Sequence, residues 1–144
     1  MLGYKRNQIE AAISGVLEPR SPEPTTELRT RLKRLLETDR ALGRAPRSND
    51  PARAHYAFYS ADSPGSGVEV WFSAYEAFAL LNGLRLMAHG WPQGFAVSVM
   101  RRARAELEKE PLVSLNRIPT SYLTKTRSEP TLEKAIWHSM LRTR

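Results

Sequence analysis

The sequence contains no cysteine among its 144 residues. This absence excludes disulfides, thiolate zinc sites and thiol nucleophiles together. Histidine is also scarce: His55, His89 and His138 lie far apart, and none has a partner three or four residues away that could help to hold a metal. We therefore expect no metal site and no cofactor.

Long apolar runs are missing as well. No stretch approaches the roughly 18 apolar residues of a membrane span, and the first ten residues, MLGYKRNQIE, lack the apolar segment of a signal peptide. We therefore expect a cytoplasmic protein without a membrane partner. With 41% hydrophobic and 26% charged residues, the composition is that of a globular chain long enough to fold as one domain.

Catalytic signatures are absent from the sequence. No serine adjoins a histidine at the spacing of a nucleophile motif, and the Gly65-Ser66-Gly67 turn lacks the following lysine of a phosphate-binding loop. Most acidic residues lie among arginines in the expected helices, where ion pairing accounts for them. We therefore expect that the protein is not an enzyme.

Acidic residues are outnumbered by basic ones, 15 to 22, which gives a net charge of +7. The excess lies in the two flanks: residues 1–50 contain ten basic and seven acidic groups, residues 51–90 two and three, and residues 91–144 ten and five. A neutral scaffold with basic flanks suits a polyanionic partner, and nucleic acid is the commonest one. The alternative is a protein whose surface is simply rich in lysine and arginine.

Apolar residues at three- and four-residue steps predict five helices. The expected helices span residues 4–17, 25–42, 73–89, 93–107 and 128–141. The last is amphipathic, and it would either dock on the core or pair with a second subunit to form a homodimer. Sequence alone leaves both alternatives open.

Two aromatic runs at the centre predict a β-hairpin. The runs are His55–Ser60 (HYAFYS) and Val68–Phe72 (VEVWF), and a loop rich in glycine and serine joins them. Alternation in the second run places Val70 and Phe72 on one face and Glu69 and Trp71 on the other. The expected fold is therefore mainly α with one β-hairpin, a small winged-helix-like domain of the α+β class.

This order of elements divides the single expected domain into four segments. They are a basic helical segment (1–43), a loop or linker (44–54), a scaffold of hairpin and two helices (55–110) and a C-terminal extension with the amphipathic helix (111–144).

Residues 70–102 resemble the region after the wing in MerR-type winged-helix DNA-binding domains. In that family a strand leads into a helix capped by Ser or Thr, a turn with glycine, and another helix. The matching pieces are Phe72-Ser73, Leu80 to Leu84, and His89-Gly90-Trp91 before Phe95 to Met100. The resemblance implies that the first two helices form a helix-turn-helix and that the hairpin is the wing.

We therefore expect a protein that binds double-stranded DNA, specifically or structurally, as a bacterial-type transcriptional regulator does. The expected nucleic-acid-binding residues carry basic or amide side chains and are Lys5, Arg6, Asn7, Arg29, Arg31, Lys33, Arg34, Arg101 and Arg102. The alternative is a protein-interaction module that binds an acidic protein partner without nucleic acid.

The sequence generates one test. Replacing Arg31 and Arg34 together by alanine should weaken binding to duplex DNA with little change in melting temperature, because neither residue belongs to the expected core. Anisotropy titrations of labelled DNA at several salt concentrations measure the affinity. Duplex binding that is absent, or that does not weaken steeply with salt, would contradict the expectation.

Overall fold

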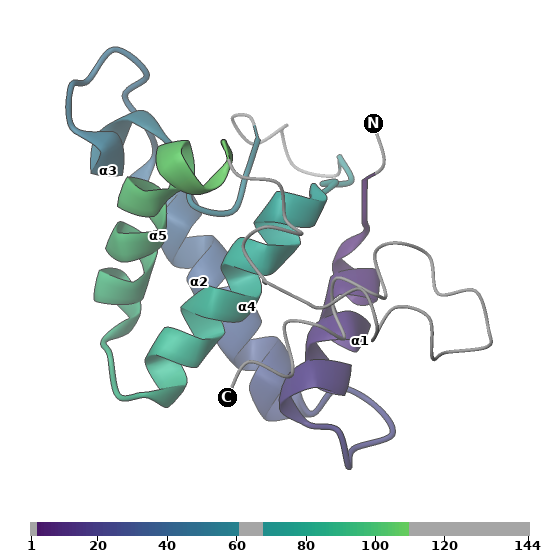
Figure 1. Cartoon of the computed structure of the whole chain (residues 1–144). Helices are drawn as coiled ribbons and strands as arrows, with labels where there is room; N and C mark the ends of the chain where they lie inside the picture. The colour runs from purple at the N-terminus through teal and green to yellow at the C-terminus, as the bar shows by residue number, and fades with distance from the viewer. Residues whose placement is uncertain (1–2, 61–67, 110–144) are drawn as a thin grey trace, which may run out of the picture.

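Five helices form the part of the chain that the structure, a computed structural model, describes: residues 3–60 and 68–109 (Figure 1). They are α1 (Arg6–Leu17), α2 (Thr26–Leu42), α3 (Pro51–Ala54), α4 (Ala74–Ala88) and α5 (Gln93–Leu107). Helix α2 contacts α1, α4 and α5, and α3 packs on α5. Since 63% of the described residues are helical and none lies in a sheet, the protein belongs to the mainly α class over this range.

The ends of the long helices follow from local side-chain chemistry. The Thr25 hydroxyl accepts a hydrogen bond from the Leu28 N–H at the start of α2, and Gly43, with a φ of 61°, ends that helix. Ser73 and Glu76 form a reciprocal capping box at the start of α4. Each of these caps uses residues within three positions of the helix end, so both helix boundaries are set locally.

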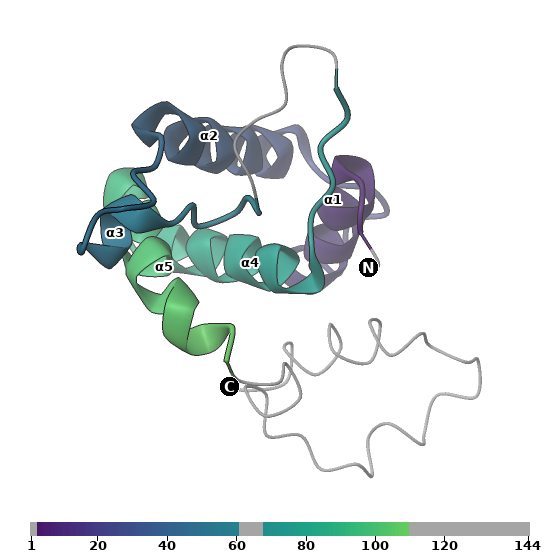
Figure 2. The same cartoon turned by 90° about the horizontal axis from the view of Figure 1, so that it is seen from above.

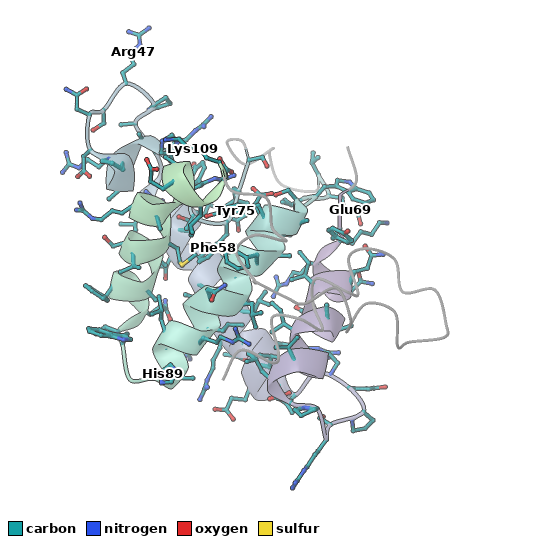
Figure 3. All side chains as sticks on the ribbon, in the orientation of Figure 1. Arg47, Phe58, Glu69, Tyr75, His89 and Lys109 are labelled. Atoms are coloured by element: carbon teal, nitrogen blue, oxygen red, sulfur yellow. The ribbon has the colours of Figure 1, made fainter. Side chains whose placement is uncertain are left out.

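The core lies between α2 and α4, where the segment that follows α3 enters the interior (Figure 2). Phe58, labelled in Figure 3, has no exposed surface and packs against Gly83 of α4. A Cβ atom at position 83 would lie 3.2 Å from the Phe58 ring and 3.4 Å from Leu35 of α2. Glycine therefore allows α4 to approach the other two elements closely.

The predicted β-hairpin, and with it the winged-helix-like α+β fold, is wrong. Residues 56–59 are buried between the helices, and residues 55–60 pair with no strand among the described residues. The second aromatic run instead contacts the amino-terminal segment, where Tyr4 and Phe72 form an isolated antiparallel bridge with N···O distances of 2.8 and 2.9 Å. Aromatic residues suit a buried irregular segment as well as a strand, so their presence did not specify pairing.

Asp39 of α2 binds the buried segment through its backbone. Its two carboxylate oxygens accept hydrogen bonds from the N–H groups of Ala57 and Phe58, at 3.1 and 3.0 Å. Arg101 of α5 neutralises the carboxylate, with 2.6 Å between Nε and Oδ1, and also donates to the carbonyls of Asp39 and Ala52. Asp39 is fully buried and Arg101 is 2% exposed, so this ion pair belongs to the core.

Arg104, one turn further along α5, binds the carbonyl groups of the same segment. It donates to the carbonyl oxygens of Tyr56 and Tyr59 at 2.8 and 2.6 Å, and its guanidinium lies 3.3 Å from the Glu76 carboxylate. Glu76 is fully buried and also accepts a hydrogen bond from the Ser60 hydroxyl. Asp39 and Arg104 thus satisfy a stretch of backbone that has no sheet partner, and Arg101 and Glu76 neutralise their charges.

Other predicted elements have mixed outcomes. The expected loop over residues 44–54 contains the short helix α3, whose first turn is capped by the Asp50 carboxylate. The predicted helix over residues 128–141, for which docking on the core and pairing into a homodimer were both left open, lies outside the described residues.

We predict that Asp39→Ala lowers the free energy of unfolding by about 3–5 kcal/mol, because it leaves the Arg101 charge and two backbone N–H groups buried without their partner. Urea unfolding followed by circular dichroism measures the change. Glu37→Ala is the matched control, since Glu37 forms only an exposed pair with Lys33 on the same helix and should cost less than about 1 kcal/mol. Equal losses of unfolding free energy in the two variants would contradict the conclusion that the Asp39–Arg101 pair supports the core.

Candidate nucleic-acid interface

A basic groove with a volume of about 560 Å³ lies between the start of α1, the carboxyl-terminal half of α2 and residues 69–72. Four cationic side chains and two carboxylates line it, so its lining carries a net positive charge. The lining residues are Lys5, Arg6, Asn7, Lys33, Leu36, Glu37, Arg40, Tyr59, Glu69, Val70 and Phe72. Figure 3 shows Glu69 beside the start of α1.

The periodicity of α2 places its cations along the groove. Arg29, Lys33 and Arg40 are separated by four and seven residues, so they lie on one flank of the helix. That flank faces α1, because the Arg29 Nε lies 3.6 Å from a carboxylate oxygen of Glu10. The flank therefore adds cations to those that α1 supplies.

The first turn of α1 contributes the other side of the groove. The Lys5 N–H donates to the Gln8 side chain at 2.8 Å, and the Gln8 N–H donates to the Asn7 side chain at 2.9 Å. These bonds fix the turn that carries Lys5, Arg6 and Asn7. The positive end of the helix dipole adds to their charge and favours an anion.

Nearby carboxylates pair with these cations. Lys5 lies 3.1 Å from Glu69, Lys33 lies 3.6 Å from Glu37, and Arg6 lies 2.9 Å from Glu10. The three cationic side chains are each between 44% and 59% exposed, and pairs of this kind contribute at most about 1 kcal/mol. A phosphate group can therefore take the place of these carboxylates at low cost.

Tyr59 links the groove to the core. The Arg40 guanidinium lies 5.1 Å from the centre of its ring, and its hydroxyl donates to the Leu36 carbonyl at 3.3 Å. Burial raises the Tyr59 pKa above its usual value, so this part of the lining stays uncharged at neutral pH.

The predicted contact residues do not all meet at this groove. Lys5, Arg6, Asn7 and Lys33 line it, and Arg29 lies on the same flank of α2. The remaining four, Arg31, Arg34, Arg101 and Arg102, do not line the groove. Arg40 lines the groove but was missed, although its place seven residues after Lys33 was a signal that could have found it.

Arg31 and Arg34 lie on the other flank of α2. Arg31 pairs with Glu27 on its own helix, and the Arg34 carbonyl accepts a hydrogen bond from Gln93 of α5. The Gln93 side chain also donates to the Thr38 hydroxyl. This flank therefore faces the start of α5 rather than α1.

The two predicted arginines of α5 are also separate from the groove. Arg101, expected to contact nucleic acid, points instead into the core, where it binds Asp39 and is 2% exposed. Arg102 is exposed and lies 3.8 Å from Asp50, near α3. The structure thus unites the cations of α1 and α2 and leaves those of α5 apart.

Residues 3–60 and 68–109 contain no group of three acidic or histidine side chains placed to hold a metal ion. None of the helices in these two ranges combines the length and the apolar character that crossing a membrane requires. Comparisons with protein-family models, with curated proteins and with solved structures gave no match for the chain.

The Tyr75 hydroxyl of α4 is buried, and Tyr75 does not line the groove. It has no hydrogen-bond partner in the described structure, and the Arg104 guanidinium lies 5.5 Å from the centre of its ring. Burial raises the Tyr75 pKa to about 12. Because the hydroxyl has no hydrogen-bond partner among the described residues, it does not define a site.

The raised pKa of Tyr75 predicts a loss of stability in alkali. In the unfolded chain tyrosine ionises near pH 10. The contribution of neutral Tyr75 to the free energy of unfolding is therefore complete below pH 10 and is lost as the pH rises towards 12. Tyr75→Phe should reduce this loss, and removing an unpaired buried hydroxyl should not destabilise the protein at pH 7. Urea unfolding from pH 8 to 11 (about three units) tests both statements, and an unchanged pH profile in the variant would contradict them.

Proposed function

We propose that this protein binds nucleic acid and that the groove between α1 and α2 holds the phosphate backbone. The observation that carries the proposal is the convergence of Lys5, Arg6, Lys33 and Arg40, from two helices, on one groove. Cations that converge on a concave surface attract a polyanion more strongly than the same number scattered over a sphere. The net charge of +7 extends the attraction beyond the groove.

The site also has the mixture of groups that phosphate recognition uses. Arginine forms paired hydrogen bonds with phosphate oxygens, lysine supplies a mobile point charge, and the Asn7 amide can donate to a phosphate or to a base edge. The transcriptional role expected from the sequence depends on such binding and stays a prediction.

A different surface supports a second candidate function, a protein-interaction module. Trp91 and Phe95, at the start of α5, stack on one another with ring centres 4.8 Å apart and are 50% and 47% exposed. Exposed aromatic side chains are enriched at protein interfaces. Arg34 lies on the flank of α2 that faces this end of α5, so an acidic partner would suit the surface.

The salt dependence of binding tests the first proposal. Arg6→Gln combined with Lys33→Gln should lower the slope of log affinity against log salt by about 1.5, since each phosphate contact contributes about 0.7–0.9. Anisotropy titrations of labelled oligonucleotides between low and moderate salt measure the slope. The melting temperature should stay nearly unchanged, because both side chains are exposed.

Arg31→Gln combined with Arg34→Gln is the matched control. It removes the same charge from the opposite flank of α2. The position of Arg31 and Arg34 outside the groove lining therefore reverses the expectation from sequence, and this double variant should change the slope by less than about 0.5. Equal effects of the two double variants would show that binding follows net charge and not the groove. Tight binding of an acidic protein, with none of any oligonucleotide, would favour the second candidate.

A further inference from the structure

Trp71 lies beside the basic groove through its contact with Lys5, and it is not one of the residues that line the groove. It lies between Val70 and Phe72, which line the groove, and it is 53% exposed. The Lys5 ammonium, which also lines the groove, lies 5.2 Å from the centre of the indole ring. An exposed aromatic ring therefore adjoins the cations that would hold a phosphate.

The backbone bridge determines which way this ring points. Tyr4 and Phe72 are paired in the antiparallel bridge, and Phe72 is 3% exposed. Because side chains alternate along extended backbone, Lys5 and Trp71 lie together on the opposite side, with Glu69 two residues away. The ion pair between Lys5 and Glu69 links the two segments beside the ring.

The backbone of Gly3 packs against the side chain of Trp71. A Cβ atom at position 3 would lie 3.2 Å from Cε3 and 3.3 Å from Cβ of Trp71, so the backbone of Gly3 already packs closely on the side chain. Together with Lys5, this contact restricts the rotation of Trp71. A ring that is fixed before binding loses little conformational entropy when a planar group stacks on it.

We propose that Trp71 is a base-stacking platform and that the ligand of the groove is a single-stranded nucleic acid, DNA or RNA. The inference rests on the proposed function and deepens it. In a duplex the bases stack on one another inside the helix and offer no free face, whereas a single strand exposes its bases beside its phosphates. Cations that follow a backbone, next to an aromatic ring that stacks a base, form the arrangement used by proteins that bind single strands.

The other exposed tryptophan provides a control. Trp91 is 50% exposed, similar to Trp71, but its ring already stacks on Phe95. It also lies next to the α5 end that contacts Arg34 and Thr38, on the flank of α2 opposite the groove. A nonspecific effect of removing an exposed indole should therefore appear equally in Trp71→Ala and Trp91→Ala.

Anisotropy titrations of the full chain with four labelled probes of equal length test the proposal. The probes are oligothymidylate, oligouridylate, an abasic strand that keeps the phosphates but lacks bases, and a duplex. Trp71→Ala should weaken binding of oligothymidylate between about 5-fold and 100-fold, the range for the loss of one stacked base. Binding of the abasic strand should change less than about 2-fold, and the salt slope should stay the same because no charge is removed.

Trp71→Phe keeps an aromatic face and should restore most of the affinity, while Trp91→Ala should bind as the wild type does. Melting temperatures establish that each variant is folded. A preference for oligothymidylate or for oligouridylate would assign the ligand to DNA or RNA. Wild-type binding to the duplex that is as tight as binding to single strands, or equal affinities of Trp71→Ala and wild type, would overturn the inference.

These outcomes separate the inference from the proposal on which it rests. If the wild type binds none of the four probes, the proposed nucleic-acid function fails. If the salt slope of binding depends on Arg6 and Lys33 but the affinity does not depend on Trp71, the groove binds phosphates and Trp71 is not a base-stacking platform.

Discussion

The fold depends on satisfying the backbone of residues 56–59, which crosses the interior between α2 and α4. Buried N–H and C=O groups need partners, and this segment has no sheet to supply them. Asp39 accepts from two of its N–H groups, and Arg104 donates to two of its carbonyls. Each charged side chain is in turn neutralised, by Arg101 and Glu76 respectively, because an unpaired charge at these buried positions would be very costly.

This arrangement explains how the cations of the chain are divided. Arg101 and Arg104 are buried in the core, where their hydrogen bonds join α5 to α2 and to the buried segment. The cations of α1 and of one flank of α2 have no such internal role and face the groove. Tyr59 joins the two regions, since its carbonyl binds Arg104 while its ring lines the groove. The lining of the groove is therefore held in place by the same contacts that hold the core.

Local signals predicted the long helices, and contacts distant in sequence determined the rest. The capping residues Thr25 and Ser73 act within three positions of themselves, so a sequence pattern reveals them. The partner of Arg101 lies 62 residues away, so its charge was read as a surface charge. The aromatic run over residues 55–60 has the same composition as a strand, and only its distant side-chain partners exclude the hairpin. Part of the groove was predictable from basic residues at helical spacing, but its convergence required the fold.

The difference between the two sets of ion pairs bears on how a ligand would bind. The Asp39–Arg101 pair is enclosed in the core and Asp39 binds the backbone of the buried segment, so loss of either partner would leave a buried charge unpaired. At the groove, the pairs of Lys5 and Lys33 are exposed and weak, so a phosphate can displace their carboxylates without disturbing the core. The chain thus combines weak, exposed ion pairs at the groove with a buried ion pair in the core. Under the proposed function, the phosphate contacts at this groove would be made by exposed charges, so their share of the affinity would fall as ionic strength rises.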